Sequence, residues 1–213
     1  MLTNILYWAA VEKYGNIIID DNYIDYLNPL IHGSVLSIFS VKEIFYEKKL
    51  NTEFSNEQLE ILDFSRGYFI YDLFKMIINK KYRNNAYIMH HICLLYFFNF
   101  FKKYNLGDVF NEALFLGELT NPILQIWLIS YQSDNKVLFR YTNHLFVIMY
   151  SIFRLILIPI STYNRSKMLL NNSNINKYDL KIVLSLFMLF NIGNMVWGRN
   201  LIKGYLKWLK KNN

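Results

Sequence analysis

Residues 87–98 read Tyr87–Ile88–Met89–His90–His91–Ile92–Cys93–Leu94–Leu95–Tyr96–Phe97–Phe98, an apolar run with two adjacent histidines near its start. An ionisable side chain that faces lipid is costly, so it normally turns toward a protein interior or a wet cavity and marks a functional site. Neighbouring residues on an α-helix project about 100° apart. We therefore expect a membrane helix here, with His90 and His91 in different roles.

The composition of the 213-residue chain is too apolar for an ordinary soluble domain. Hydrophobic residues make up 54%, aromatic residues 18% and charged residues only 18%, which indicates a polytopic membrane protein. The net charge of +7 comes from short Lys and Arg clusters between apolar segments. This pattern is typical of the flanks of membrane spans, so we exclude nucleic acid as a partner. Cys93 is the only cysteine, which rules out an intramolecular disulfide.

Six apolar segments are candidates for membrane spans, so the sequence predicts an all-α bundle of about six transmembrane helices, within a range of five to seven. These segments are Ile24–Phe45, Phe64–Asn79, Ala86–Phe101, Val109–Ser130, Tyr141–Ile160 and Leu180–Ile202. Pro122 is expected to kink or break the fourth, and Pro159 to end the fifth. Leu2–Val11 is shorter than the roughly 20 residues that a span needs. We expect it to lie at the membrane interface or to pack on the bundle.

The segments between the spans are polar and suggest three regions. Residues 1–23 form an N-terminal interfacial segment, residues 24–207 the membrane domain and residues 208–213 a basic cytosolic tail. In the connector Glu47–Asp63, Ser55 or Asn56 is expected to cap the following helix. Residues 161–179 are expected to form a polar loop. The loops on the side of both termini hold eleven Lys and Arg residues against nine on the other side, which is a small difference that favours both termini in the cytosol.

The last four residues, Lys210–Lys211–Asn212–Asn213, place two lysines at the third and fourth positions from a carboxyl end that we expect in the cytosol. This ending resembles the dilysine signal that retrieves membrane proteins to the endoplasmic reticulum. A solvated basic tail after a span gives the same pattern, and both interpretations stay open.

Polar residues inside the spans are expected to turn inward. Asp72 and Lys75 are three positions apart and are expected to form a structural ion pair. Glu118 shares one helical face with Asn121 and Gln125, and near Pro122 it is suited either to chemistry or to satisfying backbone groups freed by the kink. Arg154 is suited either to neutralising Glu118 or to reaching the interface.

Several chemistries can be judged from the residues available. The chain has four histidines, too few for the clustered motifs of membrane di-iron enzymes. A zinc site built from His90, His91 and Glu118 stays open, because zinc takes three or four nitrogen and oxygen ligands. No glycine-rich phosphate loop and no nucleophile elbow occurs in the sequence. A channel or transporter is less favoured, because the polar residues do not repeat between two halves.

Several short motifs appear in a fixed order along the chain. Arg66–Gly67–Tyr68 with Asp72 precedes Met89–His90–His91, and then come Leu116–Pro122, Arg154, and Asn194 with Trp197 and Lys203–Gly204. Together they resemble the TLC domain, the membrane domain shared by ceramide synthases, translocon-associated membrane proteins and a ceroid-lipofuscinosis protein. The resemblance runs from about Asn28 to Lys207. It is strongest to the TLC-domain-containing proteins outside the ceramide synthase branch.

The resemblance implies a helical bundle in the endoplasmic reticulum or another endomembrane, with a long cavity open to lipid. Ceramide synthases transfer a fatty acyl group from acyl-CoA to a sphingoid amine, with the histidine pair at the reacting centre. A histidine can accept the proton of an attacking amine and return it to a leaving thiol, while a carboxylate fixes its tautomer. The implied catalytic residues are His90, His91, Asp72 and Glu118. The implied substrate-binding residues are Arg154, Asn121 and Asn194.

Membrane lipid is the implied partner and acyl-CoA the implied co-substrate, and we expect no cofactor and no metal. The chain departs from ceramide synthases after His91, where the next residues are apolar and no His-Asp pair follows. Two functions therefore stay open. One is acyl transfer to a lipid amine by the histidine pair. The other is a non-enzymatic regulator of membrane lipid composition, or a cargo receptor of the endoplasmic reticulum, in which a histidine has a structural role.

Overall fold

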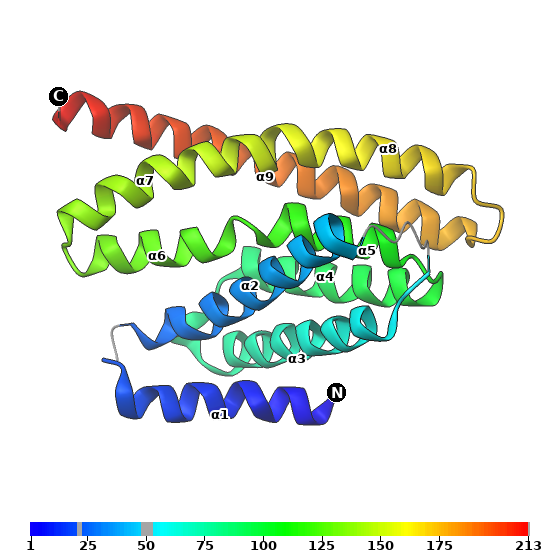
Figure 1. Ribbon diagram of the computed structural model, residues 1–213, viewed down its shortest axis with the longest axis horizontal. Helices are drawn as coiled ribbons and strands as arrows, with labels where there is room; N and C mark the ends of the chain where they lie inside the picture. The colour runs from blue at the N-terminus through cyan, green and yellow to red at the C-terminus, as the bar shows by residue number, and fades with distance from the viewer. Residues whose placement is uncertain (21–22, 48–52, 213) are drawn as a thin grey trace. The chain divides into compact units, whose positions relative to one another are not determined.

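The computed structural model describes residues 1–20, 23–47 and 53–212, and its regular structure in these ranges is helical without any strand (Figure 1). This confirms the predicted all-α membrane bundle. Contacts between residues divide the chain into two compact units. Unit 1 is Met1–Glu112 and unit 2 is Ala113–Asn213.

Unit 1 is a layered packing of helices. It contains α1 (Leu2–Ile18), α2 (Ile24–Lys42), α3 (Asn56–Ile78), α4 (Asn85–Lys103) and the start of α5 (Gly107–Glu118). Glu43–Glu47 continues α2 as a π-helix, and Lys80–Tyr82 forms a 3₁₀ turn before α4. Helix α1 packs on α2 and α3, and α3 packs on α4. Figure 1 shows α1 running alongside α3.

Local capping signals set where two of these helices begin. The Ser55 hydroxyl accepts a hydrogen bond from the backbone N–H of Gln58, and Oε1 of Gln58 accepts one from the backbone N–H of Ser55. This capping box starts α3 and confirms one of the two caps expected from the sequence. The Asn84 side chain accepts from the backbone of Ala86 and Tyr87. Helix α4 therefore begins just ahead of the histidine pair.

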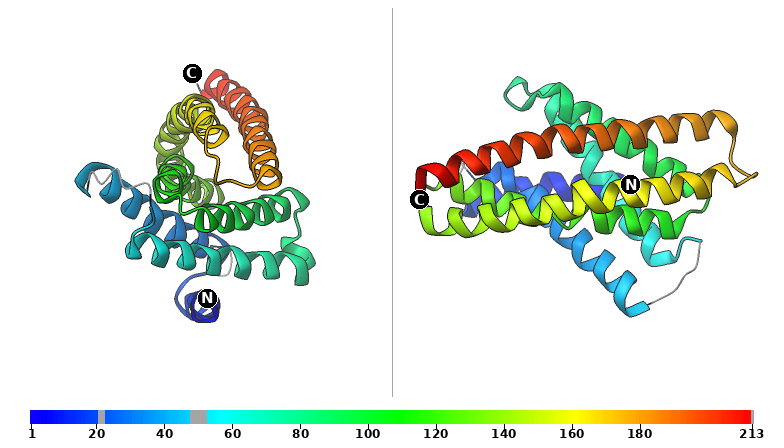
Figure 2. Two further views of the ribbon diagram at one scale, coloured as in Figure 1. Left: turned by 90° about the vertical axis from the view of Figure 1, so that its right-hand side faces the viewer. Right: turned by 90° about the horizontal axis from the view of Figure 1, so that it is seen from above.

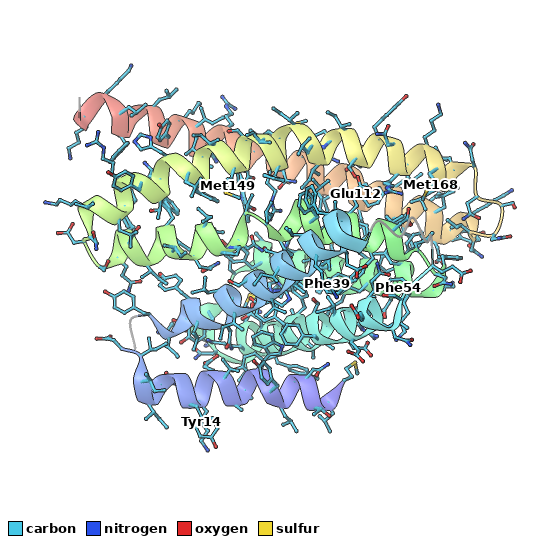
Figure 3. All side chains as sticks on the ribbon, viewed as in Figure 1. Tyr14, Phe39, Phe54, Glu112, Met149 and Met168 are labelled. Carbon is cyan, nitrogen blue, oxygen red and sulfur yellow. The ribbon has the colours of Figure 1, made fainter. Side chains whose placement is uncertain are left out.

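The core of unit 1 is aromatic. Trp8 is fully buried, and its ring meets that of His32 edge to face at 5.9 Å. The His32 ring in turn stacks on Tyr68 with centroids 4.0 Å apart. Tyr14 lies on the other face of α1 and points away from the core (Figure 3). The aromatic rings thus join α1, α2 and α3 into one packed body.

Gly67 lets α1 approach α3 closely. A Cβ atom at this position would lie 2.5 Å from Cβ of Asn4 and 3.0 Å from its backbone carbon. Backbone cannot move aside as a flexible side chain does, so the packing requires a residue without a side chain at position 67.

Unit 2 is built from long, nearly parallel helices. It contains α6 (Asn121–Gln132), α7 (Lys136–Tyr150), α8 (Ile158–Leu170) and α9 (Lys177–Asn212). The π-helical segment Ser151–Leu157 joins α7 and α8, so Lys136–Leu170 is one helix of 35 residues. Helix α9 packs along this joined helix (Figure 2), and α6 packs on α7.

Three helices are long and apolar enough to cross a membrane. They are Gly107–Gln132, Lys136–Leu170 and Lys177–Lys211, and they correspond to the last three of the six predicted spans. Helices α2, α3 and α4 form where the first three spans were predicted. The chain is therefore an integral membrane protein, and the full number of crossings stays a prediction.

Two prolines act differently from each other. Pro122 lies in the first turn of α6, and the helix is interrupted between Glu118 and Asn121, as predicted. Pro159 was expected to end its span, but α8 continues to Leu170, so the predicted loop from Ser161 is wrong in its first half. Pro159 follows directly after the π-helical segment and lies in the first turn of α8. A proline is tolerated there, because the wider turn removes the usual backbone partner of its missing N–H.

Candidate functional site

His91 and Asp72 lie together in the interior of unit 1. Nε2 of His91, on α4, is 2.9 Å from Oδ2 of Asp72, on α3. The other ring nitrogen, Nδ1, is 2.8 Å from the backbone carbonyl oxygen of Tyr87, one turn earlier on α4. The side chain of His91 is 8% exposed and that of Asp72 is 28% exposed. Asp72 is therefore the more accessible member of the pair.

The two contacts of His91 determine where protons lie. A carbonyl oxygen only accepts, so Nδ1 carries a hydrogen and donates it to Tyr87. A neutral ring would then present a lone pair at Nε2, which the nearby carboxylate would repel. A proton shared by Nε2 and the carboxylate would remove this repulsion. Nε2 and Oδ2 are 2.9 Å apart but do not meet hydrogen-bond geometry.

His90 has a different environment from its neighbour. Its ring centroid is 5.7 Å from that of His91, with the ring planes 70° apart. His91 is buried, whereas His90 is only half-buried. This is the outcome expected from the angle between successive residues on a helix.

Aromatic rings surround His91 and exclude water from its inner side. The Phe69 ring meets His91 edge to face at 5.0 Å, and Tyr68 lies 6.3 Å away. Beyond Tyr68 is His32, whose Nε2 is 3.3 Å from the hydroxyl oxygen of Ser65. His32 was not among the predicted site residues. Its signal in the sequence was the same as that of the histidine pair, an ionisable side chain in an apolar helix.

The predicted ion pair between Asp72 and Lys75 is wrong. Nζ of Lys75 lies 3.0 Å from Glu12 of α1 and 3.1 Å from Asp25 of α2. The long lysine side chain reaches two carboxylates on neighbouring helices, and this outweighs one local pair. Asp72 is therefore left to His91. Glu12 had no sequence signal, since it lies 63 positions from Lys75.

A second polar cluster lies in unit 2, where α5 gives way to α6. Arg154, in the π-helical segment, donates from Nη2 to the backbone carbonyl of Gly117 and to Oδ1 of Asn121 at 3.3 Å. Its Nε donates to the Thr120 hydroxyl at 3.2 Å. Asn121 in turn donates to Oε2 of Glu118 at 2.6 Å. The sequence predicted Glu118, Asn121 and Arg154 as site residues, and the structure brings these three together.

The cluster is explained by the interruption of the helix. A helix end leaves backbone carbonyls without partners, which is costly away from water. Arg154 satisfies the carbonyl of Gly117, and the charge of nearby Glu118 attracts the guanidinium. Gly117 and Thr120 were missed as partners. Pro122 was the only available signal, because it marks where a helix must break.

Asn194 also lies in unit 2, on α9. It is buried, and its backbone carbonyl accepts a hydrogen bond from the Tyr150 hydroxyl at 3.1 Å. Tyr150 is one helical turn before Arg154, so Asn194 holds α9 against the helix that carries Arg154.

The predicted catalytic residues divide between the two units. His90, His91 and Asp72 belong to unit 1, whereas Glu118 belongs to unit 2 with the predicted binding residues. Within residues 1–20, 23–47 and 53–212, no three His, Cys, Asp or Glu side chains are grouped so as to hold a metal ion.

The helices able to cross a membrane and the polar groups held between them define an integral membrane protein of the all-α class. The family model of the TLC domain matches residues 27–203, and the chain belongs to this family. No curated protein matches the chain. Membership of the family associates the chain with membranes and with a lipid-related function.

Proposed function

We propose that this protein is an acyltransferase of the endoplasmic reticulum or another endomembrane, which transfers a fatty acyl group from acyl-CoA to the amine of a membrane lipid. The observation that supports this most is the pairing of His91 with Asp72, with Nε2 and Oδ2 2.9 Å apart. A buried histidine beside a partly exposed carboxylate is suited to proton transfer at a reacting amine.

The reaction needs a group that takes up one proton and returns it. The lipid amine attacks the thioester carbonyl, a C–N bond forms and the C–S bond breaks. The nitrogen loses one proton to the His91–Asp72 pair, and the pair passes one proton to the leaving thiolate. The products are an amide and the free thiol of coenzyme A. Atoms and charge balance, and no cofactor is needed.

Each member of the pair has a separate part in this scheme. Asp72 is the more exposed residue and meets the substrate, while His91 behind it stabilises the charge. The carbonyl of Tyr87 keeps the hydrogen on Nδ1, so that proton exchange is confined to Nε2. His90, which is half-buried, is the candidate for protonating the thiolate directly.

The polar cluster of unit 2 is proposed to bind substrate. Nε and Nη2 of Arg154 donate to protein oxygens, while Nη1 meets no acceptor within the described part of the chain. A guanidinium with a spare donor is suited to a phosphate or carboxylate group. Asn121 and Glu118 orient Arg154, and Asn194 supports the neighbouring helix.

The test is an acyl-transfer assay on microsomes from cells that express the full chain. The substrates are an isotope-labelled long-chain acyl-CoA and a sphingoid base, and the N-acyl product is measured by mass spectrometry. The variants are Asp72→Asn, His91→Gln, both together, and His90→Ala. Cys93→Ser is the matched control, because Cys93 is buried on the same helix two residues after His91. All variants are compared at equal protein level.

We expect Asp72→Asn and His91→Gln each to lower the rate by about 10²-fold or more. The double variant should fall no further, since residues that act as a unit are not additive. Cys93→Ser should match the wild type. Product formation by Asp72→Asn and His91→Gln at the rate of the control would overturn the proposal.

A non-enzymatic lipid regulator or cargo receptor is the second candidate. The burial of His91 favours it, because both ring nitrogens face protein groups and the side chain is 8% exposed. In that case the wild type yields no labelled product. Its expression still changes the cellular lipid profile, or a partner co-purifies with it, equally in Asp72→Asn and wild type.

A further inference from the structure

The last turns of α9 carry a stripe of basic side chains. Its members are spaced three, four or one residue apart, so they share one helical face. All are exposed, and within the described ranges none of them pairs with an acidic side chain. We call these residues the basic stripe: Arg199, Lys203, Lys207, Lys210 and Lys211.

The opposite face of α9 is fixed against α7. The Tyr205 hydroxyl is 2.5 Å from Nδ1 of His144, and the Trp208 ring lies 5.4 Å from that of His144. Phe139 extends this contact, with its ring 6.1 Å from Trp208. Tyr205 and Trp208 therefore hold α9 in one rotational setting. The basic stripe is turned away from α7 as a result.

The length of α9 places the stripe outside the hydrocarbon core. The helix has 36 residues, about 54 Å at 1.5 Å per residue, whereas the hydrocarbon core is about 30 Å thick. The apolar part of α9 lies between Lys181 and Arg199. The stripe spans about 20 Å beyond it. Tyr205 and Trp208 are the residue types that settle at the level of lipid headgroups.

Further positive charge lies at the start of α7, beside this end of α9. Lys136 and Arg140 are exposed and one turn apart. Asp179 is the only acidic residue of α9, and it is about 30 Å along the helix from Arg199. Asp134, in the turn before α7, is exposed as well, so this end of unit 2 carries seven basic side chains against one acidic side chain. The stripe is therefore a region of excess positive charge at the level of the lipid headgroups.

We propose that the basic stripe binds the headgroups of anionic phospholipids, such as phosphatidylserine, in the leaflet beside it. Each basic side chain near an anionic surface contributes about 1 kcal/mol, or about fivefold in affinity. The bound headgroups hold the end of α9 at a fixed depth. Because Tyr205 and Trp208 join α9 to α7, the bound headgroups fix the depth of both helices. The proposal uses no residue of the His91–Asp72 pair and stands apart from acyl transfer.

The test measures lipid retention by the full chain in mild detergent. The protein is incubated with mixed micelles that contain equal amounts of phosphatidylserine and phosphatidylcholine. It is then repurified, and bound lipid is quantified by mass spectrometry at 0.05 and 0.5 M NaCl. The stripe variant replaces four lysines by glutamine at positions 203, 207, 210 and 211. A control variant loses the same charge from exposed lysines elsewhere, by Lys13→Gln, Lys80→Gln, Lys167→Gln and Lys177→Gln.

We expect the wild type and the control variant to retain phosphatidylserine over phosphatidylcholine at low salt. The preference should fall steeply at high salt, because exposed charges are screened. In the stripe variant the preference should fall about fivefold per charge removed. Equal retention of the two lipids by the wild type would by itself overturn the proposal, whatever the variants show. So would an unchanged preference in a stripe variant whose unfolding temperature equals that of the wild type. Wild-type retention that favours neither lipid, together with stripe-dependent binding of heparin, would assign the stripe to a soluble polyanion.

Discussion

Nζ of Lys75 lies 3.0 Å from Oε2 of Glu12, and this contact joins α3 to α1. The same ammonium group is 3.1 Å from Asp25 on α2, and the Tyr71 hydroxyl donates to Glu12 at 2.8 Å. One lysine thus connects three helices of unit 1. The arrangement is largely shielded from water, since the side chain of Lys75 is 15% exposed.

Replacing Lys75 by methionine should destabilise the protein. The change leaves the carboxylates of Glu12 and Asp25 without their main partner, and breaking a buried pair costs about 3 kcal/mol. The measurement is the thermal unfolding midpoint in detergent. Lys81→Met is the control, because Lys81 is 69% exposed and 3.6 Å from Asp25, so we expect a change below about 0.5 kcal/mol. Equal effects of the two changes would contradict the prediction.

Replacing Gly67 by alanine should separate α1 from α3. The new Cβ atom would lie 2.5 Å from Asn4, so the helices must shift, at about 1–3 kcal/mol. Gly193→Ala is the matched control, because a Cβ there meets no atom within 4 Å. The control should leave stability equal or raise it, since alanine favours a helix. Protease cleavage between α1 and α2 reports the change, and the same cleavage rate in both variants would refute it.

Replacing Arg154 by lysine should weaken unit 2 even though the charge is kept. Lysine lacks the planar fork that contacts Gly117, Thr120 and Asn121 together. The loss should be about 1.5–3 kcal/mol in unfolding free energy, the range for hydrogen bonds to charged groups. Arg140→Lys, at an exposed site on the preceding helix, should be neutral.

The charge of Glu118 provides a further check on Arg154. Arg154→Gln leaves Glu118 buried without its countercharge, so adding Glu118→Gln to it should restore part of the lost stability. A double variant less stable than Arg154→Gln alone would show that Glu118 is not stabilised by Arg154.

Replacing Tyr205 by phenylalanine should loosen α9 from α7. It removes the hydrogen bond to His144 but keeps the ring that stacks on Trp208. The expected loss is about 1 kcal/mol, measured as the unfolding midpoint. Tyr178→Phe is the control, because Tyr178 is exposed at the other end of the same helix. A larger effect from Tyr178→Phe would argue against the contact.

The features predicted well from the sequence are those with local causes. Ser55 begins α3 because the capping box lies within four residues, and Pro122 breaks its helix because it lacks a backbone donor. Within the described ranges, the apolar runs predicted where α2 to α7 and α9 form, but not the continuation of α8 to Leu170. The family assignment from the ordered motifs is confirmed by the match over residues 27–203.

The features that were missed depend on contacts between residues far apart in the sequence, or on a helix type that the sequence does not mark. The contact between Lys75 and Glu12 joins residues 63 positions apart, so a three-residue spacing misled the prediction for Asp72. The sequence offered Asp72 and Glu118 equally as partners of the histidine pair, and only the packing of α3 on α4 identified Asp72 beside His91. Pro159 was read as a stop because nothing in the sequence marks a π-helix before it.

The π-helical segment Ser151–Leu157 also sets the phase of everything that follows it. A π-turn contains one residue more than an α-turn, and one residue corresponds to about 100° of rotation. Rewinding Ser151–Leu157 as a regular α-helix of the same length would turn α8 by that angle. Leu169, now fully buried, would then leave its contacts while the sequence of α8 stayed the same. Deleting Ile152 in addition would return α8 to its present rotation, so the buried face of α8 is set by the turn type and the length of the segment before it.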